Sequence, residues 1–254
     1  MRQVVKRVLQ AMTSKICGAR PISSWPAFLG RIHEIRLPRS VIPQHSCSPT
    51  GSVNINILIA MIDQTLSVLG DVAECGVGSS LVPMAIYLRQ KGSPKRVLGF
   101  DSFEGFPESI QIDLELGGAN LDSDKKVGGL SETSLELVQS KVDRFDLTNV
   151  ELVKGYFKES LERYRDHQFS FVHLDCDMYS SYKECLEFFY PRLTSSGVLL
   201  LDEYNDPAWP GCNRAVDDFL SGKPEKVQSI VCDNYQKFFF VKCEAAPRRR
   251  GASA

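Results

Sequence analysis

The chain has 254 residues, of which 43% are hydrophobic and 24% charged, a composition typical of one globular domain with a short extension. It contains no run of eighteen apolar residues, so the sequence predicts no membrane span. The formal net charge of −1 conceals an asymmetry, because residues 40–247 hold 19 basic and 30 acidic residues while residues 1–39 hold eight basic residues and one acidic residue. Such an acidic body excludes a nucleic-acid platform, which needs a clustered positive face.

Residues 1–51 are expected to form a basic, partly helical extension, because they combine an excess of arginine and lysine with one apolar helical face. That face consists of Val5, Val8, Leu9, Met12 and Ile16. The segment is interpreted either as an organellar targeting sequence or, preferably, as an amphipathic helix that packs on the body or on a partner. The eight cysteines include no Cys-x-x-Cys pair, which favours reduced thiols and a cytoplasmic location.

From residue 52 onward, helical stretches alternate with short apolar strands. In chain order the pattern predicts helix 54–69, strand 71–75, helix 79–90, strand 96–100, helix 133–145, strand 150–153, helix 158–165, strand 169–174, helix 179–193, strand 197–201, helix 213–220, and strands 227–232 and 237–242. This alternation predicts an α/β fold with a mostly parallel sheet covered by helices on both faces. The last two strands are too close in sequence for a crossover helix and should be antiparallel. The compact domain is expected to span 52–243, followed by a flexible tail, 244–254.

A long polar insert, residues 103–132, follows the second predicted strand. Its length and its glycine pairs permit two interpretations: a solvated surface loop, or a lid that orders over the active site and excludes water. The lid is the preferred interpretation, because the insert comes directly after a strand end.

The first predicted strand has Glu74 next to its end and leads into a helix through Gly76 and Gly78. Asp101 stands at the end of the next strand, where a carboxylate can accept hydrogen bonds from both hydroxyls of a ribose. These features indicate a cofactor that contains adenosine, either a dinucleotide or S-adenosylmethionine. Because Leu81 stands where a dinucleotide fingerprint has its third glycine, the sequence favours S-adenosylmethionine.

Acidic residues follow the fourth and fifth predicted strands, with Asp175 after strand 169–174 and Asp202 and Glu203 after strand 197–201. Because adjacent parallel strands end at the same edge, these carboxylates can converge, and oxygen-only ligands select a hard cation such as Mg²⁺. Asp177 is expected to be the N-cap of the following helix. His173 lies on the same side of its strand as Asp175 and is left without a role.

The combination of ECGVGSS, FDSFEGFPE, GYFKESL, HLDCDMYSSYKECLEFFYPRL, SGVLLLDEYND and NRAVDDF resembles the macrocin O-methyltransferase family over roughly residues 52–243. The resemblance implies a Rossmann-like class I methyltransferase with a seven-stranded, mostly parallel sheet whose last strand is antiparallel. It also implies that S-adenosylmethionine contacts Glu74, Gly76, Gly78, Ser79, Asp101, Ser102 and Phe157, and that Mg²⁺ binds Asp175, Asp202 and Glu203. The family usually has Asp where Glu203 stands.

These observations lead to the hypothesis of an Mg²⁺-dependent O-methyltransferase whose acceptor is a hydroxyl of a sugar or glycosylated small molecule. In this hypothesis Asp175 is the catalytic base, with Asp177 as the second candidate, and the protein is a homo-oligomer. One alternative is an oxidoreductase of the NAD type, which the missing third glycine disfavours. The other is a methyltransferase-like module that binds without catalysis, which is disfavoured because an inert domain does not need mutually repelling carboxylates.

Overall fold

The computed structural model describes residues 51–107, 111–116, 131, 133–232 and 235–244. The predicted helical face of the N-terminal extension, most of the insert 103–132 and nearly all of the tail lie outside these residues. The described part begins with helix α3 (Gly51–Gln64), one residue before the predicted start of the domain.

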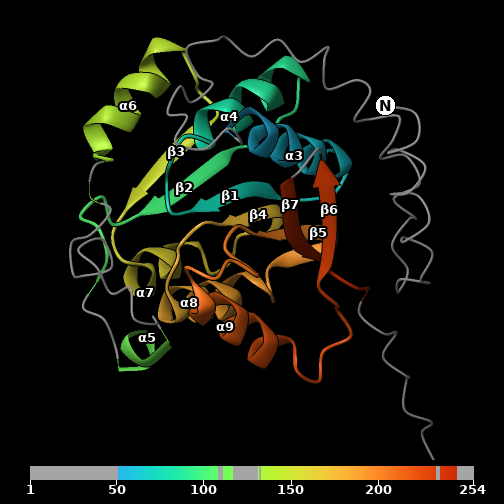
Figure 1. Ribbon diagram of the computed structural model, residues 1–254. Helices are drawn as coiled ribbons and strands as arrows, with labels where there is room; N and C mark the ends of the chain where they lie inside the picture. The colour runs from blue at the N-terminus through green and yellow to red at the C-terminus, as the bar shows by residue number, and fades with distance from the viewer. Residues whose placement is uncertain (1–50, 108–110, 117–130, 132, 233–234, 245–254) are drawn as a thin grey trace, which may run out of the picture.

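A seven-stranded sheet forms the centre of the molecule (Figure 1). Its strands are β1 (Asp71–Cys75), β2 (Val97–Asp101), β3 (Val150–Lys154), β4 (Phe169–Leu174), β5 (Leu193–Leu201), β6 (Gln228–Cys232) and β7 (Tyr235–Val241). Their order across the sheet is β3-β2-β1-β4-β5-β7-β6. The first five strands pair in parallel, whereas β7 is antiparallel to both of its neighbours. The predicted α/β class, the parallel sheet and the antiparallel last strand are therefore confirmed.

Helices cover both faces of the sheet (Figure 1). Besides α3 they are α4 (Leu81–Gln90), α5 (Gln111–Leu116), α6 (Leu135–Arg144), α7 (Phe157–Ser160), which continues into a 3₁₀ turn at Leu161–Tyr164, α8 (Tyr179–Phe189) and α9 (Pro210–Leu220). One face is covered by α3, α4 and α6, and α7, α8 and α9 lie on the other. Among the described residues, no helix is long and apolar enough to cross a membrane.

Two hydrophobic clusters, one on each face, form the core. Alternate residues of β4 enter different clusters: Phe171 packs beneath α3 and α4, and Val172 packs beneath α8 and α9. All six residues of β4 are buried, as expected for a central strand of a parallel sheet that is covered on both faces. The strands of this sheet are therefore rigidly held, and the side chains that follow their carboxyl ends have fixed positions.

Several element boundaries differ from the predicted ones for identifiable reasons. Helix α8 ends at Phe189 instead of residue 193, because Pro191 has no N–H to donate the next hydrogen bond of the helix. Helix α9 starts at Pro210 instead of residue 213, since proline suits the first turn of a helix. Helix α6 begins after Ser134, whose side chain accepts the Leu137 N–H at 3.2 Å. The sequence pattern did not predict α5, which lies within the insert.

Candidate active site

Strands β1 and β4 end side by side, at the point where the strand order reverses. In the register of the sheet Glu74 pairs with His173 and Cys75 pairs with Leu174, and the Asp175 N–H donates to the Cys75 carbonyl at 2.9 Å. On the next strand, the Asp202 N–H donates to the Leu174 carbonyl at 2.9 Å. Open parallel sheets bind ligands at this place, where successive connections leave in opposite directions.

Gly76 and Gly78 turn the chain from β1 into α4. Gly76 has a φ of +83°, and a Cβ atom there would lie 1.7 Å from the Asp175 carbonyl oxygen, so the turns after β1 and β4 touch. A Cβ at Gly78 would meet nothing within 4 Å, which leaves open space above this turn. Ser79 is exposed, whereas Ser80 is buried and donates its hydroxyl to Glu74.

Asp101 ties the turns after β1 and β2 together. Its Oδ2 accepts the Val77 N–H at 2.7 Å and its Oδ1 accepts the Phe103 N–H at 2.6 Å. Burial raises the pKa of Asp101, while these two hydrogen bonds act in the opposite direction. Ser102 donates its hydroxyl to the Gly105 carbonyl at 2.8 Å and thereby shapes the start of the insert. Both residues thus have structural contacts of their own beside the expected contact with a cofactor.

Phe157 follows β3 and not one of these turns. It is the first residue of α7, a helix that contacts β2, and it is half-buried against the hydrophobic cluster on the α8 face of the sheet. Its expected position on the adenine side of a cofactor stays a prediction.

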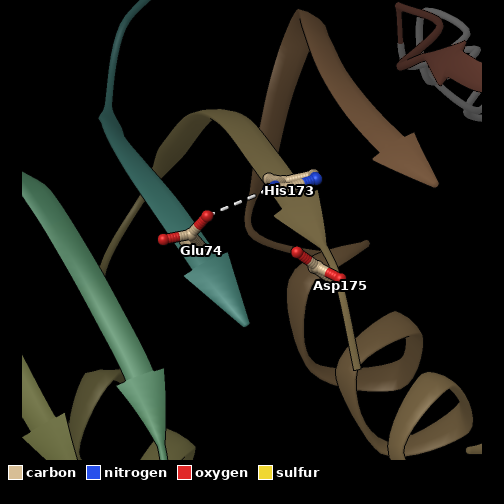
Figure 2. A group of neighbouring side chains, drawn as sticks. All are labelled: Glu74, His173 and Asp175. Carbon is tan, nitrogen blue, oxygen red and sulfur yellow. Dashed lines mark hydrogen bonds and ion pairs between the residues drawn. The ribbon is translucent and has the colours of Figure 1, made fainter. Parts of the chain in front are cut away.

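A buried hydrogen-bonded network runs beneath the strand ends. His173 places Nδ1 3.1 Å from Oε1 of Glu74 and Nε2 3.1 Å from Oδ1 of Asp202 (Figure 2 shows Glu74, His173 and Asp175). Lys237 of β7 donates its ammonium to the same Oδ1 of Asp202. Although burial opposes a charged imidazole, its two carboxylate partners raise the pKa of His173 to about 10. His173, which had no predicted role, therefore links the carboxyl end of β1 to the turn after β5.

The three predicted metal ligands converge. Asp175, Asp202 and Glu203 each offer a carboxylate oxygen, and these oxygens lie within 4.8 Å of one another. Glu203 is buried, and the Tyr182 hydroxyl lies 2.6 Å from its Oε2. We refer to Asp175, Asp202 and Glu203 as the carboxylate cluster.

The three carboxyl groups of the carboxylate cluster differ in pKa, because burial, mutual repulsion and positive neighbours affect each of them differently. Burial and the charges of Asp175 and Asp202 hold the pKa of Glu203 well above its usual range. Burial and the nearby Asp202 raise the pKa of Asp175 to about 6. Burial acts in the same direction on Asp202, but Lys237 and His173 outweigh it and hold the pKa of Asp202 well below its usual range. The cluster thus offers only oxygen ligands, which fits a hard divalent cation.

Glu74, His173 and Asp175 form a second group that could hold a metal ion (Figure 2). One ligand atom of each side chain lies within 4.8 Å of those of the other two. Both ring nitrogens of His173 already face carboxylates, so its imidazole has no lone pair to offer when it is protonated. Of the two groups found among the described residues, the carboxylate cluster is therefore the better cation site.

The predicted N-cap role of Asp177 is wrong. The N-cap of α8 is Met178, which has extended backbone, and Asp177 occupies the left-handed region with a φ of +60°. The Asp177 carbonyl oxygen accepts the thiol of Cys212 at 2.8 Å. Aspartate tolerates this conformation better than most residues, which explains its place in the tight turn between the end of β4 and α8.

The strand order with its reversed β7, the glycine turn after β1 and the acidic residues at the strand ends define a Rossmann-like methyltransferase fold. Two solved structures share it: the calicheamicin methyltransferase CalS11 (TM-score 0.65, 20% identity, 87% of this chain and 91% of that chain) and the O-methyltransferase NovP (TM-score 0.64, 21% identity, 87% and 96%).

The profile of the Macrocin-O-methyltransferase (TylF) family matches residues 34–239, and the chain belongs to this family. The family match begins at residue 34, before residue 52, where the sequence analysis placed the start of the domain.

Among characterised relatives, the 8-demethyl-8-(2,3-dimethoxy-alpha-L-rhamnosyl)-tetracenomycin-C 4'-O-methyltransferase of Streptomyces olivaceus is 31% identical over 161 residues, which cover 59% of this chain and 58% of the relative. The mycinamicin III 3''-O-methyltransferase of Micromonospora griseorubida is 28% identical over 196 residues, which cover 74% of this chain and 76% of the relative.

Proposed function

We propose that this protein transfers a methyl group from S-adenosylmethionine to a hydroxyl group of a sugar or glycosylated small molecule, with Mg²⁺ bound at the carboxylate cluster. The observation that carries the proposal is the convergence of Asp175, Asp202 and Glu203 next to the glycine turn after β1. The family assignment supports O-methylation, and the names of both relatives describe O-methyltransferases. The tetracenomycin relative is named for a rhamnosylated compound, which supports a glycosylated acceptor for this chain.

Each part of the site has a task in this reaction. The turn of Gly76 and Gly78 and the carboxylate of Asp101 are proposed to hold the cofactor, because open space above Gly78 admits a ligand close to the backbone. Asp175, Asp202 and Glu203 would hold the cation. When bound, the cofactor supplies an electrophilic methyl group, and the cation lowers the pKa of a hydroxyl that coordinates it.

The protein must then remove the acceptor's proton and keep the acceptor oxygen in line with the methyl group. Asp175 is the proposed base, because it is half-buried at the strand edge, and burial together with the nearby Asp202 raises the pKa of its carboxyl group when no cation is bound. Asp202 is held ionised by Lys237 and His173, and Glu203 is bonded to Tyr182, so these two side chains are better suited to holding the cation.

A turnover experiment tests the proposal directly. The full chain is incubated with S-adenosylmethionine and a panel of glycosides, sugar diols and catechols, in Mg²⁺ or in chelator, and mass spectrometry detects the addition of one methyl group. We expect methylation of at least one glycoside or sugar diol in Mg²⁺ and its loss in chelator. Undiminished methylation in chelator would contradict the metal role, and methylation of catechols alone would contradict the acceptor class.

A further inference from the structure

Lys237 brings an ammonium group to the edge of the carboxylate cluster. It lies on β7 between Gln236 and Phe238, pairs across the sheet with Ile230 and is only 2% exposed. Its ammonium donates to Oδ1 of Asp202 and lies 3.3 Å from the Asp202 main-chain oxygen. Burying a lysine is costly unless the charge is paired, and here the partner is one of the proposed metal ligands.

We propose that Lys237 is a built-in counter-ion of the carboxylate cluster: it stabilises the cluster when no divalent cation is bound and lowers the affinity of the cluster for one. The inference rests on the metal site of the proposed function. Lys237 would act through the charge of Asp202 and not on the reacting groups, because its ammonium is buried and donates to Asp202.

The charges around the cluster support this role. Within the described chain, the positive side chains in contact with Asp202 are His173 and Lys237, and the acids nearby are Glu74, Asp175 and Glu203. A cation that binds these acids must approach the ammonium, and like charges repel strongly in a partly buried site. Without a cation, the same ammonium offsets part of the repulsion among the carboxylates.

The position of Asp202 does not depend on Lys237 alone. His173 contacts the same carboxylate oxygen at 3.1 Å, and the Asp202 N–H donates to the Leu174 carbonyl at 2.9 Å. Removing the ammonium should therefore change mainly the charge of the site and leave its geometry in place. The expected effect on cation affinity is an increase and not a loss.

Calorimetric titration with Mg²⁺ and with Mn²⁺ tests the proposal on the full chain. We expect Lys237→Met to bind Mg²⁺ about tenfold more tightly than the wild type, the size of effect that a unit charge a few ångström from a divalent ion produces. Lys237→Arg should keep the wild-type affinity, because it preserves the charge. The matched control is Lys242→Met, which removes an ion pair with Glu225 beyond the other end of β7 and should also keep it.

Thermal unfolding supplies a readout that does not depend on catalysis. In chelator, Lys237→Met should unfold at a lower temperature than the wild type, and Mg²⁺ should raise its unfolding temperature by more than it raises that of the wild type. Lys237→Gln keeps a hydrogen-bond donor for Asp202 and carries the same expectation if the methionine variant does not fold.

Two results would count against the proposal, and they can be told apart. If the wild type binds Mg²⁺ and the Lys237→Met and Lys237→Gln variants bind it equally or more weakly, the counter-ion role is refuted and the metal site stands. If neither the wild type nor any variant binds a divalent cation, the metal site itself is refuted, and with it the inference.

Discussion

Three carboxylates of similar chemistry have different tasks because their surroundings differ. Asp202 contacts Lys237 and His173, which hold its pKa well below the usual range, whereas burial and the neighbouring acids hold the pKa of Glu203 well above its usual range. Asp175 lies between these extremes, with a pKa of about 6. Environments that separate the pKa values of neighbouring acids commonly separate their roles as ligand and as base.

Replacing Asp175 by Asn removes both a cation ligand and the proposed base. We expect Asp175→Asn to lower turnover by a factor of about 10² or more, the usual contribution of a general base, while the affinity for S-adenosylhomocysteine stays nearly unchanged. Turnover is measured with saturating cofactor, and affinity by calorimetry.

Asp177→Asn is the control for that experiment, because Asp177 is the second candidate base and asparagine also tolerates left-handed backbone. It should retain most of the activity. Loss of turnover in Asp177→Asn, with Asp175→Asn still active, would move the base to Asp177.

The residues of the site could be predicted only in part. Glu74 and Asp101 lie at the carboxyl ends of apolar strands, and Asp175, Asp202 and Glu203 follow such strands, so their common edge was predictable. The bridge made by His173 was not, because it depends on β1 and β4 being neighbours in a register that pairs Glu74 with His173. The sequence feature that could have indicated a role for His173 was its position on the same side of its strand as Asp175.

At the scale of elements, the turn between β1 and α4 is the best determined part of the site. Gly76 adopts left-handed backbone and has no room for a side chain, since a Cβ would overlap the Asp175 carbonyl oxygen. Gly92 also has a positive φ, of +62°, but a Cβ there would meet nothing within 4 Å. An alanine at Gly92 would therefore carry only the cost of left-handed backbone, whereas an alanine at Gly76 would also carry a steric overlap.

Gly92→Ala should lower the free energy of unfolding by about 1–2 kcal/mol, the cost of left-handed backbone for alanine. Gly76→Ala adds an overlap between two main-chain turns, so we expect a loss of about 3 kcal/mol or more. Urea unfolding followed by circular dichroism measures both. Equal losses for the two variants would show that the turns after β1 and β4 do not touch in solution.

Element types were more predictable than element ends or partners. Apolar runs such as FSFVHL and VLLL identify strands, but the pairing of β5 with β7 joins segments separated by α9 and β6. Lys237 shows the consequence. In the sequence it stands at the start of an apolar run, and only the insertion of β7 between β5 and β6 brings its ammonium to Asp202.

At the scale of the whole molecule, the parts proposed to hold the cofactor and the cation all lie at the carboxyl edge of one sheet. A ligand bound there contacts turns that follow β1, β2, β4 and β5, so it ties together strands that are far apart in the sequence. Binding at such an edge should stabilise the folded state as a unit, because a ligand that binds only the folded form shifts the unfolding equilibrium.

We therefore expect S-adenosylhomocysteine at about 100 times its dissociation constant to add about 2.7 kcal/mol to the free energy of unfolding, which for a domain of this size raises the unfolding temperature by about 5–10 °C. The shift should persist in chelator, since the proposed cofactor residues do not include Asp202 or Glu203. NAD should produce no shift. Stabilisation by NAD without stabilisation by S-adenosylhomocysteine would replace the proposed methyltransferase with a nucleotide-dependent oxidoreductase.

The same measurement on a shortened chain tests the extent of the domain. A variant of residues 34–254 retains the whole family match and every described element, from α3 to β7. Because the described residues that form the sheet edge and both hydrophobic clusters lie within it, we expect the same shift with S-adenosylhomocysteine as in the full chain. Both chains are measured at the same concentration of S-adenosylhomocysteine. A smaller shift in the shortened chain would mean that residues 1–33 take part in cofactor binding.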